Sequence, residues 1–299
     1  MARKKHAAKK TARRRPIRGS QKFVARKPPS RRRVPPRSTA PRKTMVIVHG
    51  AGSFPDDYYK PLVAAIEQRL GGVFSYVPVY YADVTNPPAT VLALAAPVPD
   101  SPAAAQFKQD LMAEMQRSYA ASLQSRRAAG VTVQEVETLD VSCIGLVQII
   151  VKEVGQYLFT PGIAAQIQAR LVAGLDQAAR QSDAIVLASL SLGTVVSIDV
   201  LRQFADRYEI SYWFTTGCPL GKLRRVGVRP ANLGAIKPAN VTRWYNLYDT
   251  TDIIAEAIGP QFPAYRLHDI YVEVGNDPVS AHDYFNNGET LDLLADAMR

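Results

Sequence analysis

Cysteine is scarce in this chain, with Cys143 and Cys218 the only two among 299 residues. Two such cysteines provide no disulfide framework, and neither has the neighbouring Cys or His spacing that a zinc site requires. Long apolar runs are also missing, because no segment reaches the roughly 18–20 apolar residues that span a bilayer. We therefore expect a cytoplasmic protein with reduced thiols, no metal site and no transmembrane segment.

Acidic residues are absent from positions 1–43, which hold 18 of the 37 lysines and arginines. The remaining 19 basic residues face all 26 acidic ones, so the formal charge is +18 in this tail and −7 in the rest of the chain. The tail also contains many Pro, Ala and Ser residues. Because such a composition cannot bury a core, we expect the tail to be disordered.

Three roles for the basic tail stay open. It could make nonspecific contact with nucleic acid or an anionic membrane, since counterion release draws a cationic segment to either surface. It could be an organellar targeting segment, because it is rich in arginine and free of acids. It could also have no function, because initiation at Met45 would yield the remaining chain without it.

Residues 44–299 have a suitable length for one α/β domain. Strand-like and helix-like segments alternate, which predicts a mostly parallel, doubly wound sheet with helices on both faces. Pro78 places its strand at a sheet edge or a bend. Region 91–161 is longer than a crossover helix requires, and core packing is favoured for most of it over a cap or lid above the active site. The expected strands lie near 45–52 (including the turn that follows), 73–81, 184–187, 209–216, 241–248 and 269–274, and the expected helices near 57–70, 103–129, 163–179 and 194–201.

Ser191 lies between the apolar run 184–187 and the helix-like segment 194–201. A serine at the apex of a strand, a tight turn and a helix is typical of the nucleophile elbow G-x-S-x-G, whose small residues let strand and helix approach closely. Here Ser189 replaces the first glycine and Gly193 keeps the second. The simpler alternative is an ordinary surface turn in which serine is a turn or N-cap residue.

A nucleophilic serine needs a base, and the chain has only four histidines. His6 lies in the tail, and His268 precedes the last expected strand, at the wrong end of a parallel sheet. His49 belongs to a glycine-rich turn, where a histidine more often fixes the loop than transfers protons. His282 follows the last expected strand, and we predict it as the general base.

Two aspartates follow the strand that ends at Tyr248, and either could orient the base. Asp252 is preferred because the apolar Ile-Ile-Ala run after it can anchor the loop, whereas Asp249, the alternative acid, is suited to an Asx-turn. The expected oxyanion hole combines the backbone N–H of Leu192 with an N–H from Ala51 or Gly52. Alternatively, that glycine turn only reverses the chain.

Several separated segments together resemble the α/β-hydrolase superfamily, namely VIVHGAG, the SLG elbow leading into TVVSIDVL, TTGCPLG, RWYNLYDTTDIIA and AHDYF. More narrowly, the chain resembles poorly characterised bacterial serine hydrolases with a VxHSLG-type elbow, a GSPLG loop, a WxNxxDxxDPVA acid loop and an AHxxY histidine loop. The match runs in order from about residue 45 to 299. The resemblance implies Ser191 as nucleophile, Asp252 as acid and His282 as base.

Two positions depart from this pattern. Leu190 stands where the elbow more commonly has histidine, and Ile253 stands where the acid loop has proline. Neither change removes a catalytic group, but both leave the substrate preference open.

From these features we predict a serine esterase or related hydrolase that cleaves a carboxylic ester or another acyl bond. A Ser-His-Asp triad would form an acyl-enzyme, with no metal or organic cofactor. Two alternatives remain, because a fold indicates the reaction type better than the substrate. One is a noncatalytic binding protein with this scaffold, tethered to nucleic acid or anionic membrane by the tail, and the other is a phospholipid-directed lipase.

Overall fold

The computed structural model describes residues 43–88, 100–128, 130, 141–204, 206–227, 240–262 and 267–299. The tail predicted at 1–43 lies outside these residues except for Lys43, which begins the first strand. Parts of the predicted cap region, 91–99, 129 and 131–140, also lie outside them. Residues 40–299 form one structural unit.

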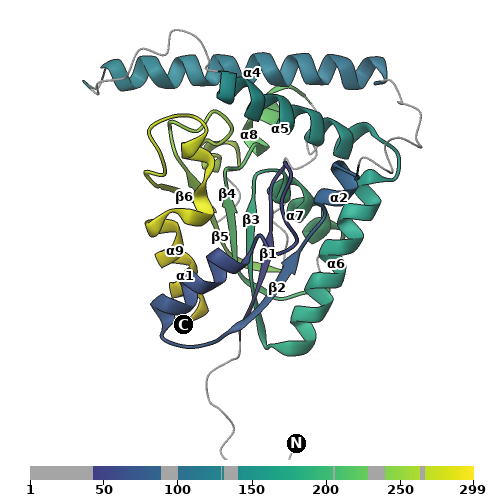
Figure 1. The fold of residues 1–299 in the computed structure, drawn as a ribbon, viewed down its shortest axis with the longest axis vertical. Helices are drawn as coiled ribbons and strands as arrows, with labels where there is room; N and C mark the ends of the chain where they lie inside the picture. The colour runs from purple at the N-terminus through teal and green to yellow at the C-terminus, as the bar shows by residue number, and fades with distance from the viewer. Residues whose placement is uncertain are drawn as a thin grey trace, which may run out of the picture. The chain divides into compact units, whose positions relative to one another are not determined.

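The described strands form a six-stranded sheet in which every neighbouring pair is parallel, in the order β2-β1-β3-β4-β5-β6 (Figure 1). The chain steps from β1 outward to β2 and then continues on the other side of β1, so the winding reverses between β1 and β3. In such sheets, ligands bind outside the carboxyl ends of the strands at this reversal. The predicted doubly wound parallel sheet is therefore confirmed for the described residues. The strands are β1 (Lys43–Val48), β2 (Ser75–Val79), β3 (Ala184–Leu190), β4 (Ile210–Thr216), β5 (Val241–Tyr248) and β6 (Leu267–Tyr271).

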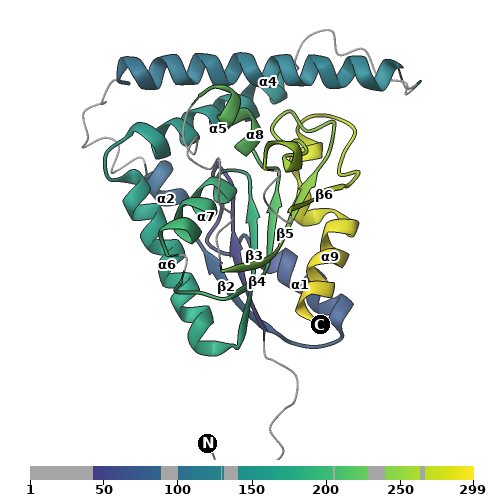
Figure 2. The same ribbon diagram turned by 180° about the vertical axis from the view of Figure 1, so that it is seen from behind.

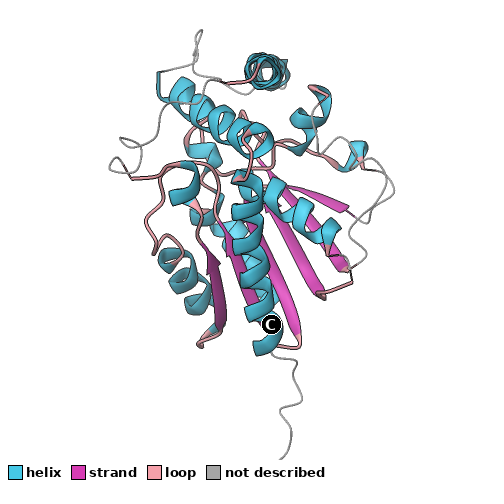
Figure 3. Cartoon of the chain, turned by 90° about the vertical axis from the view of Figure 1, so that its right-hand side faces the viewer, coloured by secondary structure: helices cyan, strands magenta, loops and turns pink. Residues whose placement is uncertain are grey.

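Helices cover both faces of the sheet (Figures 2 and 3). Successive side chains of a strand point to opposite faces. In β1, Met45 and Ile47 accordingly pack in the cluster that contains residues of α1 and α9, whereas Val46 and Val48 pack in the cluster that contains residues of α6 and α7. The principal helices are α1 (Lys60–Leu70), α2 (Ala82–Thr85), α4 (Pro102–Ala128), α5 (Val141–Phe159), α6 (Ile163–Gln181), α7 (Leu192–Gln203), α8 (Leu220–Arg225) and α9 (Gly288–Met298).

Most elements lie within a few residues of their predicted positions. α1 begins three residues later than expected, because the segment before it forms turns and Pro61 favours a helix start. β2 is an edge strand, as Pro78 indicated. β6 begins two residues earlier than expected and ends at Tyr271, which lengthens the loop that leads to His282.

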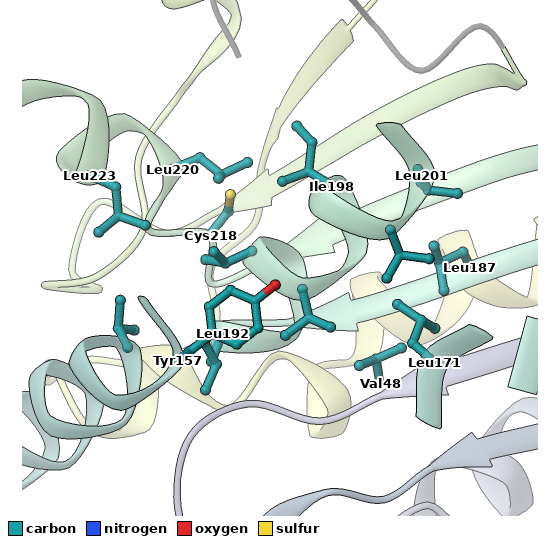
Figure 4. Close-up of a cluster of buried hydrophobic side chains, with 14 of the residues drawn as sticks. Val48, Tyr157, Leu171, Leu187, Leu192, Ile198, Leu201, Cys218, Leu220 and Leu223 are labelled. Carbon is teal, nitrogen blue, oxygen red and sulfur yellow. The ribbon is translucent and has the colours of Figure 1, made fainter. Parts of the chain in front are cut away.

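One large apolar cluster joins the sheet to α6 and α7 (Figure 4). Leu192, the first residue of α7, lies in this cluster with Val48, Leu187 and Cys218. Burying an aliphatic side chain of this size contributes about 1.5–3 kcal/mol relative to leaving it exposed. The core therefore anchors the start of α7, directly after Ser191.

The helices α4 and α5 lie across the carboxyl ends of the strands (Figure 1). Phe107, Leu111 and Met115 of α4 are buried in the main core cluster. Leu146 of α5 packs against the same cluster and also lines a cavity that Ser191 lines. This region therefore contributes to the core and also covers part of the candidate site.

Within the described ranges no single helix has the length and hydropathy of a membrane span, and α5 and α6 meet that test only as a pair bent by 93°.

Candidate functional site

Ser191 occupies a strained turn between β3 and α7. Its φ of 51° and ψ of −120° make it the one non-glycine residue with positive φ in the described part of the chain. Backbone strain of this kind typically costs about 1–3 kcal/mol and persists only where the surroundings enforce it. The Ser191 N–H donates to Thr216 O at 2.9 Å, and Thr194 Oγ1 donates to Ser191 O at 2.7 Å. These bonds hold the serine at the apex of the turn.

The small residues around Ser191 are required by the closeness of strand and helix. A Cβ at Gly193 would lie 2.5 Å from His49 O, so only glycine fits there without a shift of the backbone. Ser189, which replaces the first glycine of the elbow pattern, is bonded within the sheet. Its hydroxyl donates to Phe214 O and accepts from Trp213 Nε1, both at 2.9 Å. The departure at position 189 thus leaves the turn intact.

His282 and Asp252 form a hydrogen-bonded pair. His282 Nδ1 lies 2.8 Å from Asp252 Oδ2, and Asp252 Oδ1 accepts from Ile254 N–H at 2.8 Å. Asp252 is only 4% exposed, so its carboxylate interacts with these donors rather than with bulk water. An ionised acceptor favours the proton on Nδ1, which leaves Nε2 as the acceptor of the ring.

Gly217, after β4, makes room for the imidazole of His282. A Cβ at Gly217 would lie 2.6 Å from His282 Cε1, and its φ of 59° is in the left-handed region that favours glycine. The TTGCPLG segment thus has a direct structural role next to the histidine.

Ser191 and His282 line the same cavity of about 180 Å³. The apolar side chains of Phe54, Leu146 and Val279 form part of its wall. Ser191 Oγ is buried and has no hydrogen-bond partner among the described residues. The hydroxyl is therefore available to a bound molecule or to the histidine.

Asp249, the alternative acid, is used differently. Its Oδ1 accepts from Thr251 N–H at 2.7 Å, and its Oδ2 accepts from Val274 N–H at 2.8 Å and Gly275 N–H at 3.2 Å. Asp249 therefore forms an Asx-turn and ties the loop after β5 to the loop after β6. The carboxylate that contacts His282 is Asp252.

Of the two backbone donors expected from the glycine turn after β1, one is used elsewhere. The Gly52 N–H donates to Glu153 Oε1 at 3.0 Å, so the predicted use of this N–H in an oxyanion hole needs correction. Ala51 N–H has no acceptor recorded in the described part of the chain. Leu192 begins α7, and the first N–H groups of a helix have no partner within the helix. Ala51 and Leu192 thus remain as the two candidate donors.

His49 fixes the glycine turn. Its Nδ1 lies 2.7 Å from Gly50 O, and its Nε2 accepts from Tyr81 N–H at 3.0 Å. The Tyr81 hydroxyl donates to His49 O at 2.6 Å. Burial lowers the pKa of His49 to about 4, so the ring is neutral near pH 7 and both nitrogens serve the loop.

Tyr284 is a site residue to which the sequence analysis assigned no role. Its hydroxyl accepts from Asp249 N–H at 2.8 Å and donates to Asp252 Oδ2 at 3.0 Å. Burial and the nearby charge of Asp252 raise the pKa of Tyr284 well above its usual value, so the hydroxyl keeps its proton. The only signal in the sequence was the tyrosine two residues after His282.

A second, larger cavity of about 670 Å³ is lined by Asp252 and by residues of α4 and α8. Lys222 and Glu256 on its wall form an ion pair at 3.3 Å. Burial lowers the pKa of Lys222. Burial alone would raise the pKa of Glu256, but hydrogen bonds from Arg225 and the charge of Lys222 lower it overall. Arg225 also binds Glu114, and this contact ties α4 to the rest of the domain.

The described residues contain no cluster of three or more His, Cys, Asp or Glu side chains that could hold a metal ion. Burial raises the pKa of the Cys218 thiol to about 12, which keeps it protonated.

No protein-family model matches the chain, and no curated protein matches it significantly. The fold defines an α/β protein whose candidate site lies at the carboxyl ends of β1, β3, β5 and β6.

Proposed function

We propose that this protein is a serine hydrolase of the α/β-hydrolase type that cleaves a carboxylic ester or a related acyl bond. One observation carries the proposal. Ser191, in a strained strand-to-helix turn, shares a cavity with His282, whose Nδ1 is bonded to the buried Asp252. A serine, a histidine and an orienting carboxylate are the groups that acyl transfer requires.

In the proposed reaction, Ser191 Oγ attacks the carbonyl carbon while His282 takes the hydroxyl proton through Nε2. Asp252 keeps the other ring nitrogen protonated and stabilises the imidazolium that forms. His282 then returns the proton to the leaving alcohol. Water, deprotonated by the same histidine, attacks the acyl-enzyme and releases the acid.

Peptide geometry supports the Ala51 N–H as an oxyanion donor. In a trans peptide, the N–H points opposite to the C=O of the preceding residue. The C=O of Gly50 accepts from His49 Nδ1 and from the Tyr81 hydroxyl, so the Ala51 N–H points away from both. The turn is also close to the nucleophile, because a Cβ at Gly50 would lie 2.8 Å from Ser191 Cβ. With the Leu192 N–H it would supply two donors to the oxyanion.

Labelling with a fluorophosphonate probe tests the proposal. We expect the parent protein to be labelled and to hydrolyse p-nitrophenyl acetate, and Ser191→Ala and His282→Ala to lose both properties. Ser197→Ala is a matched control, because Ser197 Oγ is also buried without a partner among the described residues but lies six residues, or more than one and a half helical turns, further along α7. This variant should be labelled like the parent.

Absence of labelling in a folded parent would reject the hydrolase proposal in favour of a noncatalytic scaffold. Labelling that survives Ser191→Ala would assign the reactive group to another residue and would equally reject the proposed role of Ser191.

A further inference from the structure

Glu153 is a buried carboxylate that the proposed reaction does not use directly. It lies on α5 and is 1% exposed. Its Oε1 accepts from Gly52 N–H at 3.0 Å and from Asn86 Nδ2 at 2.7 Å, whereas its Oε2 has no partner among the described residues. A buried carboxylate that loses its hydrogen-bond partners is strongly unfavourable. The bonds to Glu153 are therefore maintained, and they constrain the loop that contains Gly52.

Asn86 completes the contact from the other side of Gly52. Its Nδ2 donates to Gly52 O at 3.4 Å as well as to Glu153 Oε1. The orientation of the amide is set by Lys152, whose Nζ donates to Asn86 Oδ1 at 3.4 Å. Both backbone polar groups of Gly52 are thus held by side chains from α5 and from the C-terminal end of α2.

The restraint on Gly52 extends to Ala51. The Ala51–Gly52 peptide is fixed through the Gly52 N–H, and the Gly50–Ala51 peptide is fixed through the Gly50 C=O. The Ala51 N–H belongs to the Gly50–Ala51 peptide, and the Glu153 contact fixes the Ala51–Gly52 peptide, so neither peptide can turn with the other. Glycine at position 52, with a φ of 123°, would otherwise leave the turn free to rotate.

We propose that Glu153 and Asn86 are positioning residues that aim the Ala51 N–H at the oxyanion. This inference rests on the proposed function. A preorganised donor strengthens its hydrogen bond as charge develops in the transition state, whereas substrate binding depends on it much less. Loss of the Glu153–Asn86 contact should therefore lower kcat and leave KM nearly unchanged.

The first experiment compares Glu153→Ala with Glu153→Gln in the full chain, using p-nitrophenyl acetate. Removal of one oxyanion donor typically costs about 10²–10³ in kcat, and we expect Glu153→Ala to lose about 10²-fold with KM within about twofold of the parent. Glutamine can present one oxygen to both donors, so Glu153→Gln should recover most of this loss. Asn86→Ala, which keeps the Glu153 bond to Gly52, should lose less than Glu153→Ala.

A trifluoromethyl ketone inhibitor provides the readout that a purely structural role would not change. Its adduct with a serine carries an oxyanion, so its Ki in Glu153→Ala should rise by the same factor as kcat/KM falls. Glu114→Ala is the matched control, because Glu114 is a buried glutamate on the neighbouring helix α4 that binds Arg117 and Arg225. This control should lower the unfolding midpoint without changing kcat or Ki.

The inference is overturned if Glu153→Ala keeps kcat within about twofold, or if Glu114→Ala reproduces its effects on kcat and Ki. Should Glu153→Ala fail to fold, unchanged kcat and Ki in Asn86→Ala would overturn it as well, because that variant removes the bonds from Asn86 to Gly52 O and to Glu153. These results differ from failure of the proposed function. In that case the parent itself is not labelled by fluorophosphonate, or the esterase activity survives in Ser191→Ala.

Discussion

The two aspartates after β5 provide a pair of conservative substitutions that separates an effect on the proposed catalysis from an effect on stability. In Asp252→Asn, the amide oxygen can keep the bond to Ile254 N–H, and the NH₂ group replaces Oδ2. That group would face two donors, His282 Nδ1–H and the Tyr284 hydroxyl. The histidine relieves the conflict by carrying its proton on Nε2, where it cannot accept a proton from Ser191. In Ser-His-Asp triads, loss of the correct tautomer costs about 10⁴ in kcat, or about 5.5 kcal/mol of transition-state stabilisation, and the proposed function predicts a loss of this size here.

In Asp249→Asn, the same change should act on stability instead. Asp249 accepts three backbone N–H groups, from Thr251, Val274 and Gly275. Asparagine retains one acceptor oxygen, so at least one N–H group would be left facing an NH₂ group in a buried site. Hydrogen bonds to charged groups contribute about 1.5–3 kcal/mol each, and we expect a loss of about 3 kcal/mol in the free energy of unfolding.

The assay is urea unfolding combined with kcat for p-nitrophenyl acetate. We expect Asp252→Asn to lose activity with a free energy of unfolding within about 2 kcal/mol of the parent, and Asp249→Asn to remain within about tenfold of parental kcat while being less stable. The reasoning is refuted if Asp249→Asn is the variant that abolishes activity, or if Asp252→Asn remains active.

Two further predictions concern residues around the same site. Gly217→Ala should lower kcat by about 10²-fold, because its Cβ would lie 2.6 Å from His282 Cε1 and displace the ring; unchanged kcat in the folded variant would contradict this placement. His49 should make stability depend on pH, because its folded pKa of about 4 is below the usual 6.5. The unfolded chain then binds the extra proton between these values, so stability is present above pH 6.5 and falls by about 3 kcal/mol as the pH drops to 4. Urea unfolding across this range should show a smaller decline in His49→Gln, and equal declines would rule out His49 as the cause.

The order of the elements could be predicted because strand-like and helix-like segments alternate along the sequence. The apolar run 184–187 and the alternating segment 241–248 both predict strands, and the helix-like segments between such strands predict a parallel sheet with helices on both faces. The boundaries were less certain where no local signal marks them, as at β6, whose burial pattern has no clear alternation. The apolar segment 141–159 received no assignment from the sequence, and it forms the helix α5; its length of 19 residues fits a helix and exceeds that of a typical strand.

By itself, the sequence determined the candidate groups, since so few residues could serve. Four histidines and one elbow-like serine in a strand-turn-helix context left Ser191 and His282 with little competition. Only the tertiary structure decided which hydrogen-bond partner each of the neighbouring residues has. It assigned Asp252 to His282 and Asp249 to backbone N–H groups, and it gave the Gly52 N–H to Glu153, which is 101 residues away in the chain. The physical reason is that a hydrogen bond depends on distance and direction in space, and the loops after β1, β5 and β6 acquire these only when the parallel sheet brings their strand ends to one edge.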